Sequence, residues 1–268
     1  MRAEGQHKQC TTCVMHKLLM RKLGANQEAR RAQARLWGAH MNLQWADRNI
    51  YWQHRSMSRV GMDQNGSPVI SAIVDSMGHA KWAVPRSACL HAKTFNTFHR
   101  PQLTVTALIA HGRGILLALG EPYVTQGGDW TCELVAHLFH WLTANNIDLR
   151  ECHIRIQADN ATKECKNNSL ARLLSLYVGR RRVRSCQLNF CLSGHSHEDV
   201  DQFFSLLSSY LQRQRELPDS EAFAEALRQY MSNPGVRPHE PLRAVVKIDR
   251  VRDWRLGLRL STCCVRRT

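Results

Sequence analysis

The chain has 268 residues, of which 43% are hydrophobic and 22% are charged, a balance that is ordinary for a globular protein. It contains no run of about 18 apolar residues and no apolar signal-peptide core at its N-terminus, which argues against a membrane-spanning or secreted protein. Lysine and arginine exceed aspartate and glutamate by 15 charges. We therefore expect a soluble intracellular protein with a polyanionic partner, nucleic acid before membrane.

The N-terminal segment, residues 1–24, contains a Cys-x-x-Cys pair, Cys10 and Cys13, with His16 nearby. Such a pair is half of a structural zinc site, which needs four ligands and usually a second pair about 12 to 20 residues further on. No second pair follows, so the segment predicts a partial Zn²⁺ site at most. Most of the ten cysteines are expected to be reduced core residues, because the chain is large and carries no export signal.

Residues 25–60 predict a long basic amphipathic helix. From Asn26 to Arg59 there is no proline, and apolar or small residues recur every three or four positions on an arginine-rich background. This stripe consists of Ala29, Ala32, Leu36, His40, Leu43 and Asp47. We expect the helix to pack against the main domain or a second copy of the chain, with DNA contact as the alternative. Residues 61–68, rich in Gly, Asp, Asn and Pro, predict a linker.

Residues 69–215 predict the main α/β domain. Three or four strands come first, at 69–74, 81–84, 102–110 and 114–119. Helices and strands then alternate, with helix 129–145, strand 154–158, helix 168–178, strand 186–192 and helix 198–214. Strand–helix–strand connections favour parallel pairing, so we expect a mixed sheet of the order β-β-β-α-β-α-β-α with helices on its faces. Residues 216–268 predict a further helix at 219–231, then an extended linker and a basic tail.

Three of the strand-like runs lead into carboxylates. Asp75 follows the first strand, Asp159 follows the strand at 154–158, and Asp201 lies on the helix after the strand at 186–192. Residues at strand ends on a rigid sheet are well placed for chemistry. The alternative is a scatter of strand-end aspartates with no common role.

This order of elements and acids resembles the ribonuclease-H-like fold of DDE transposases and retroviral integrases. The chain also resembles an uncharacterised family of eukaryotic transposon-derived proteins, marked by Asp-Asn, a downstream Lys-Asn-Asn, and Gly-His-Ser/Thr before an acid and a Phe. The matching residues are Asp159, Asn160, Lys166, Asn167, Asn168, Gly194, His195, Ser196, Asp201 and Phe204. The resemblance covers nearly the whole chain.

The resemblance implies a metal-dependent polynucleotidyl transferase or nuclease that acts on DNA. Such enzymes hold two Mg²⁺ or Mn²⁺ ions between carboxylates, and Mg²⁺ prefers oxygen ligands. The expected ligands are Asp75, Asp159, Asp201 and Asn160, with Asp75 bridging both ions. Glu198 and Asp199 compete with Asp201 for the place of the third acid. His195 would steer the attacking water or contact a phosphate, or serve as a plain hydrogen-bonding residue.

The side chains expected to bind nucleic acid follow Asp159 or form an arginine cluster. They are Lys163, Lys166, Asn167, Arg180, Arg181, Arg182 and Arg184. The arginines could equally form a solvated loop, and an asparagine in this position could cap a helix. Two other functions compete with DNA cleavage: a catalytically inactive, domesticated transposase domain that only binds nucleic acid, and a ribonuclease or exonuclease on the same fold. We expect a nuclear or otherwise intracellular protein without a membrane partner, and a homo-oligomer remains open.

Overall fold

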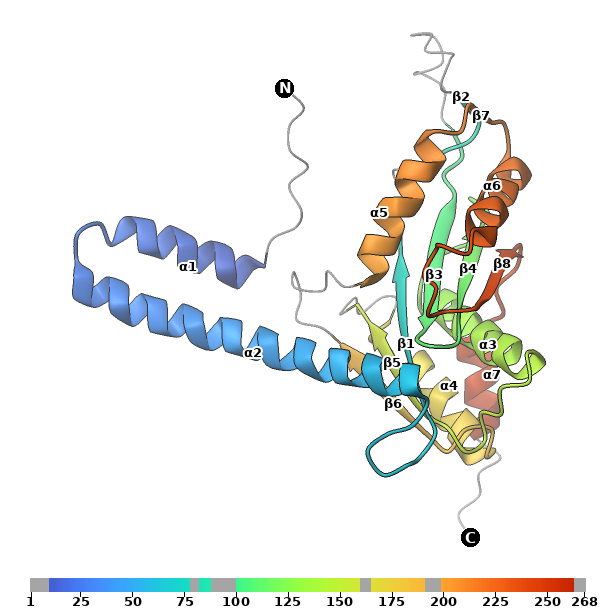
Figure 1. The fold of residues 1–268 in the computed structure, drawn as a ribbon, viewed down its shortest axis with the longest axis horizontal. Coiled ribbons are helices and arrows are strands. Elements are labelled where there is room, and N and C mark those ends of the chain that lie inside the picture. Colours follow the sequence, from blue (N-terminus) through green and yellow to red (C-terminus); the bar gives the residue numbers. More distant parts are fainter. Residues whose placement is uncertain (1–9, 78–81, 88–99, 160–164, 191–198, 263–268) are drawn as a thin grey trace.

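The computed structural model describes residues 10–77, 82–87, 100–159, 165–190 and 199–262, and its centre is a six-stranded mixed sheet (Figure 1). The strands are β1 (Val69–Ser76), β3 (Thr104–Ala110), β4 (Gly114–Gly120), β5 (His153–Ala158), β6 (Ser185–Phe190) and β8 (Leu242–Ile248). Their spatial order is β6–β5–β1–β3–β4–β8. Strands β1, β3 and β4 form an antiparallel meander, while β5 and β6 run parallel to β1 and β8 runs parallel to β4.

The predicted fold class, an α/β mixed sheet of ribonuclease-H-like order with helices on its faces, is confirmed. One predicted strand differs. Residues 82–84 contribute only an isolated bridge between Ala83 and Gln102. The chain continues into β2 (Arg86–Ser87), which pairs with β7 (Glu216–Leu217) in a separate two-stranded sheet. Pro85 lies between the two segments and has no N–H group for a sheet ladder, so the strand predicted at 81–84 cannot run on as a regular one.

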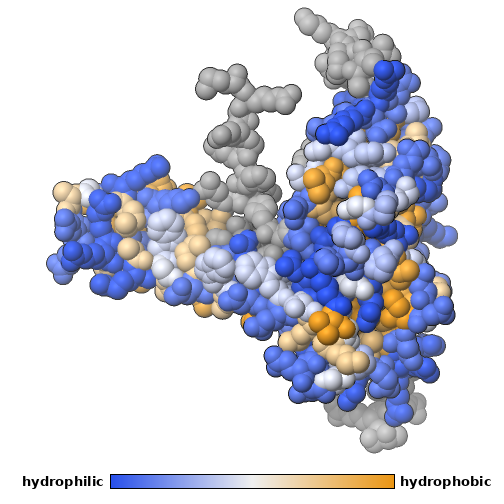
Figure 2. Space-filling model, viewed as in Figure 1, coloured by the Kyte–Doolittle hydropathy of each residue, from blue (hydrophilic) through white to orange (hydrophobic). Residues whose placement is uncertain are grey.

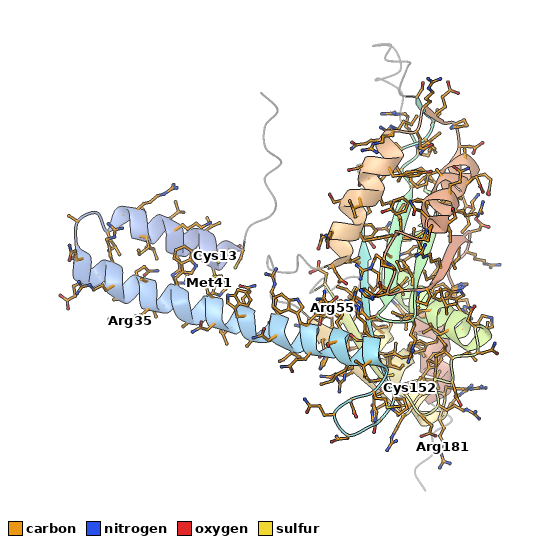
Figure 3. The ribbon with its side chains drawn as sticks, in the orientation of Figure 1. Cys13, Arg35, Met41, Arg55, Cys152 and Arg181 are labelled. Atoms are coloured by element: carbon orange, nitrogen blue, oxygen red, sulfur yellow. The ribbon has the colours of Figure 1, made fainter. Side chains whose placement is uncertain are left out.

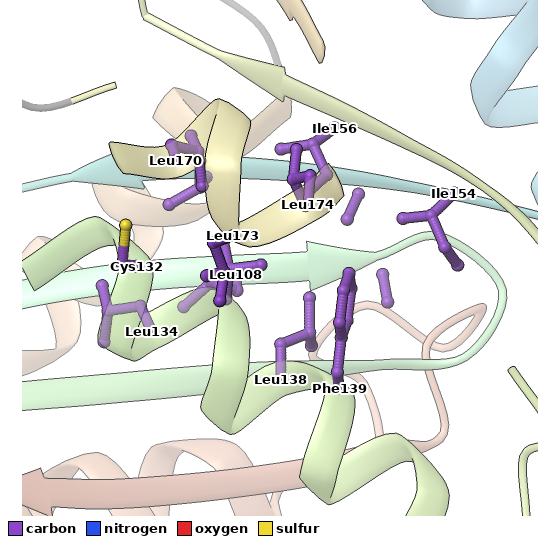
Figure 4. Packing of buried hydrophobic residues seen from close by; sticks show 14 of the residues in the cluster. Leu108, Cys132, Leu134, Leu138, Phe139, Ile154, Ile156, Leu170, Leu173 and Leu174 are labelled. Carbon is purple, nitrogen blue, oxygen red and sulfur yellow. The ribbon is translucent and has the colours of Figure 1, made fainter. Parts of the chain in front are cut away.

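Helices cover both faces of the sheet. On one face, α3 (Gly128–Ala144), α4 (Asn168–Gly179) and α7 (Trp254–Thr262) pack over β1 and β5 (Figure 4). On the other face, α5 (Asp199–Gln212) and α6 (Ser220–Ser232) cover β1, β3 and β4. Strands β3 and β4 are buried along their whole length, because helices lie on both sides of them.

The first two helices form an arm that projects from the sheet (Figure 1). Helix α1 (Thr11–Lys22) folds back on the first part of α2 (Gln27–Val60), which has 34 residues and is therefore about 50 Å long. Asn26 caps the start of α2, and Gly61 ends it with a positive φ of 94°. The arm carries hydrophilic residues interspersed with apolar ones (Figure 2). None of the described helices combines the length and apolar character that a bilayer-spanning segment needs.

The segment after Pro241 differs from the extended linker and tail that the sequence predicts. It forms β8, which joins the sheet beside β4, and then α7, which packs on α3 and α4. Glu133 on α3, only 4% exposed, holds this segment in place. Its carboxylate accepts hydrogen bonds from the Arg252 guanidinium at 2.8 Å and from Trp254 Nε1 at 2.9 Å. The C-terminal region is thus an integral part of the sheet domain.

Candidate active site

Two of the predicted acids lie at the C-terminal ends of neighbouring strands of the sheet, β1 and β5. Strands β1 and β5 are parallel neighbours, and their register pairs Val74 with Ala158. The next residues along the two strands are Asp75 and Asp159. Val74 and Ala158 both point into the core under α3 and α4, so strand alternation places Asp75 on the opposite face, which α5 covers, and Asp159 is the first residue after β5. The structure therefore brings together two acids that are 84 residues apart in the sequence.

The third acid, Asp201, lies on α5 above this face. It is seven residues before Ser208, so the two share one side of the helix. Ser208 Oγ is 3.9 Å from Met77 Sδ just beyond the end of β1. Asp201 is half-buried and lies beside the buried stripe of α5, on the same flank as Ser208. Helix α5 thus presents Asp201 to the same face of the sheet as Asp75.

Asp199, a competing third acid, is committed to a buried ionic network instead. Its side chain is 9% exposed. Tyr51 Oη donates to Asp199 Oδ1 at 2.5 Å, and the Arg237 guanidinium donates to Asp199 Oδ2 at 2.6 Å. His111, which is fully buried, has its Nδ1 3.7 Å from the same carboxylate oxygen. Asp199 therefore joins α2, the β3–β4 turn and the segment before β8, and it is a structural residue.

Glu240 completes this network. Its side chain is 1% exposed and lies 3.2 Å from Arg237 Nε and 3.3 Å from the Arg59 guanidinium. Burial by itself raises the pKa of Glu240, but the His111 imidazole 3.8 Å away and the charges of the two arginines lower this pKa from 4.5 to about 2. The pKa of Asp199 is also lowered, because His111 and Arg237 outweigh the effect of burial. Burial lowers the pKa of His111, and its two acidic neighbours oppose that shift.

The donor chemistry of the three acids suits a hard divalent cation. Asp75, Asp159 and Asp201 offer carboxylate oxygens, which Mg²⁺ and Mn²⁺ prefer to nitrogen or sulfur. These acids do not form a compact group: in the part of the chain that the structure describes, the one trio of ligating side chains whose ligand atoms all lie within 4.8 Å of each other is Cys10, Cys13 and His40. A site for two ions about 3.5–4 Å apart does not require all three acids within this distance, because acids that bind different ions lie further from each other.

The other residues predicted at this end of the strands divide into two groups. Asn160, Lys163, His195 and Glu198 lie outside the described residues. Lys166 is described and exposed, and its ammonium lies 5.5 Å from the ring centroid of Phe190, at the end of β6 that adjoins Ala158. Asn167 caps α4, because its Oδ1 accepts the backbone N–H of Leu170 at 3.0 Å. Lys166 therefore remains near the acids, whereas the amide of Asn167 serves the fold.

The predicted arginine cluster lies at the opposite end of the strands, near the start of β5. Arg180, Arg181, Arg182 and Arg184 are exposed and follow α4, and the backbone N–H of Arg184 donates to Cys152 O just before β5 begins. Figure 3 shows Arg181 and Cys152 at this end of the molecule. Six residues of β5 separate the cluster from Asp159, a distance of about 20 Å. A cavity of about 770 Å³ beside the cluster, lined partly by Arg180 and Arg182, is therefore not part of the acidic site.

Beside the middle of α2, the predicted pair Cys10 and Cys13 meets a residue that the zinc prediction missed. His40 on α2 places its Nε2 3.4 Å from Cys10 Sγ. Burial raises the pKa of the Cys10 thiol, but hydrogen bonds at the start of α1 lower the pKa by more than burial raises it. The pKa therefore lies below its ordinary value. His40 belongs to the periodic stripe of residues 25–60, and only the pairing of α1 with α2 shows that it faces the cysteines.

Residues 93–262, more than half of the chain, match the family described as "Domain of unknown function (DUF7869)". The chain belongs to this family. The DUF7869 region contains Asp159 and Asp201, begins after Asp75, and extends through β8 to the end of α7. A sequence comparison with curated proteins found no match.

Among solved structures, this DUF7869 protein is similar to the "Mos1 transposase paired-end complex with left transposon end" (TM-score 0.42, 10% identity, covering 64% of this chain and 49% of that chain). It is also similar to the "Mos1 Strand Transfer Complex" (TM-score 0.34, 10% identity, 68% and 53%), so the chain spans about half the length of these transposases. A third is the "Human cytomegalovirus terminase nuclease domain, Mn soaked, inhibitor bound" (TM-score 0.22, 12% identity, 80% and 87%). Similarities at this level carry no information about activity.

Proposed function

We propose that this DUF7869 protein is a metal-dependent nuclease or polynucleotidyl transferase of the DDE type that acts on DNA phosphodiesters. The observation that supports the proposal is the register of β1 and β5, which pairs Val74 with Ala158, the residues just before Asp75 and Asp159. Asp201 on α5 supplies the third acid. The bonds of the Asp199 carboxylate to Tyr51 and Arg237 support Asp201 rather than Asp199 in this role.

The electrostatics of the site support a cation between these acids. Neighbouring strands are about 4.8 Å apart, so the Asp75 and Asp159 carboxylates repel each other unless a positive charge lies between them. In this proposal Asp75 would bridge two Mg²⁺ or Mn²⁺ ions, with Asp159 and Asp201 each completing one ligand shell. The bound ions would supply Lewis-acid activation of water or a 3′-hydroxyl and stabilisation of the leaving oxygen.

The positive charge of the chain supports a nucleic-acid substrate. The net charge is +15, and Lys166 lies near the C-terminal ends of the strands that carry the acids. The arginine cluster of residues 180–184 lies about 20 Å away, at the N-terminal end of β5. This position suits contact with a distant part of an extended polyanion rather than with the reacting phosphate.

The decisive experiment is a cleavage and strand-transfer assay on labelled DNA with Mg²⁺ or Mn²⁺, comparing the wild type with Asp159→Asn. This substitution removes charge without changing volume, so we expect metal-dependent cleavage to fall to background while folding and DNA binding persist. Asp148→Asn is the matched control, because Asp148 is an exposed acid near the opposite end of β5. Cleavage that survives in Asp159→Asn, or binding that is lost together with cleavage, contradicts the proposed role.

One observation favours a second function, binding without cleavage. The three acids do not converge within 4.8 Å as the Cys10, Cys13 and His40 ligands do. A wild-type protein that binds DNA but cleaves neither DNA nor RNA with either metal would establish a binding module derived from a transposase. The same assay on labelled RNA separates a ribonuclease from a DNA-acting enzyme.

The arginine cluster has its own test. Each arginine that contacts a phosphate releases counterions, so the logarithm of the binding constant falls linearly with the logarithm of the salt concentration. We expect replacement of Arg180, Arg181, Arg182 and Arg184 by glutamine to weaken DNA binding and to flatten this dependence. An unchanged slope assigns the cluster to a solvated loop.

A further inference from the structure

Two cysteines and a histidine meet between the two helices of the arm. Cys10 and Cys13 lie at the start of α1, and both are 8% exposed. His40 lies in the middle of α2, with its Nε2 3.4 Å from Cys10 Sγ, and the ligand atoms of all three side chains lie within 4.8 Å of one another. Figure 3 shows Cys13 and Met41 facing each other across the same helix pair.

The spacing of these atoms fits a tetrahedral zinc site. With Zn–S bonds of about 2.3 Å and Zn–N bonds of about 2.05 Å, tetrahedral geometry places a sulfur and a nitrogen ligand about 3.6 Å apart and two sulfur ligands about 3.8 Å apart. The observed sulfur–nitrogen distance of 3.4 Å is close to the first value. Two thiolates and one imidazole form a donor set that favours Zn²⁺ over Mg²⁺ or Ca²⁺.

Helix α1 buries little apolar surface of its own, although His16 stacks on Trp37 of α2. Cys13 is the only buried residue of this fully described helix, and its larger apolar side chains Met15, Leu18 and Leu19 are 52%, 45% and 40% exposed. A helix of 12 residues is marginal in water without tertiary packing. Little apolar burial is therefore available to hold α1 against α2, whereas a metal ion bound by both helices would cross-link them directly.

We propose that Cys10, Cys13 and His40 bind a structural Zn²⁺ ion that clamps α1 onto α2. A water molecule or a fourth side chain completes the tetrahedral shell. The proposal extends the partial site predicted from the cysteine pair, because the missing ligand comes from the facing helix rather than from a second Cys-x-x-Cys pair. It does not depend on the carboxylate site, which lies on the sheet domain.

The test uses the full-length protein purified with its thiols reduced, and measures zinc content by atomic absorption after dialysis. We expect one equivalent of zinc in the wild type and loss of that equivalent in Cys13→Ser and His40→Ala. Cys186→Ser on β6 and His140→Ala on α3 are the matched controls, because both residues lie on the sheet domain, and both variants should keep the zinc. Zinc content that is equal in His40→Ala and the wild type, or absent from the reduced wild type, overturns the proposal.

Two further readouts do not require any variant to fold. Titration of the metal-free wild type with Co²⁺ should produce a thiolate-to-cobalt charge-transfer band, and a spectrum without that band excludes the cysteines as ligands. Removal of zinc with a chelator should speed tryptic cleavage at Lys17, Arg21 and Lys22, because α1 would no longer be held on α2. Equal cleavage rates with and without zinc contradict a clamping role.

Discussion

Asp199 and Asp201 lie two residues apart on α5, yet we propose opposite roles for them. Asp199 is buried and bonded to Tyr51 and Arg237, whereas Asp201 is half-buried and lies on another side of the helix. We therefore predict that Asp199→Asn lowers stability and keeps DNA cleavage by the folded protein, and that Asp201→Asn does the reverse. The pair is a matched test, because both substitutions remove one charge without changing volume.

The size of the Asp199 effect follows from its partners. Removing one member of a buried ion pair costs about 3–5 kcal/mol, because the remaining charge is left without compensation. Arg237 still has Glu240 at 3.2 Å, and asparagine can accept one of the lost hydrogen bonds, so we expect the lower end, about 3 kcal/mol. Asp201 is half-buried and the substitution keeps its volume, so Asp201→Asn should cost less than about 1 kcal/mol.

Unfolding in urea, followed by tryptophan fluorescence, measures both effects. A loss of 3 kcal/mol should lower the unfolding midpoint of Asp199→Asn by about 1 M or more, at the slopes typical of urea unfolding. Cleavage is then measured at a temperature and protein concentration where each variant is folded. The reasoning is refuted if the two variants lose equal stability, or if folded Asp199→Asn has no activity while Asp201→Asn retains it.

Three further predictions concern the frame around the site. The lowered pKa of Glu240 means that its contribution to stability is complete above pH 4.5 and is lost as the pH falls toward 2, so Glu240→Gln should show a smaller loss of stability over this range than the wild type, as measured by denaturation at each pH. Gly112→Ala should destabilise the protein more than Gly24→Ala in urea unfolding; both glycines have positive φ, but only at Gly112 would the added carbon lie 2.7 Å from the backbone of Arg59. Glu133→Gln should weaken the attachment of α7 and make the chain more sensitive to trypsin after Arg252, and unchanged proteolysis would contradict this.

The local elements of the fold could be predicted from the sequence, because they depend on short-range patterns. Alternating apolar residues predicted β1 and β5, a period of three to four residues predicted α4 and α5, and a periodic, proline-free run from Asn26 to Arg59 predicted α2. The segment after Pro241 was harder. Its prolines and basic residues resemble those of a tail, and β8 becomes a strand only because β4 offers it a parallel partner.

The candidate site shows the same division. The sequence by itself determined which acids follow strands and predicted that Cys10 and Cys13 form half of a metal site. Only the tertiary structure decided that Asp75 lies next to Asp159, that Asp199 belongs to a buried network with Arg237, and that His40 faces the cysteines. The physical reason is that periodicity specifies which face of an element is apolar, whereas the partner of a polar side chain is set by contacts between segments far apart in the chain.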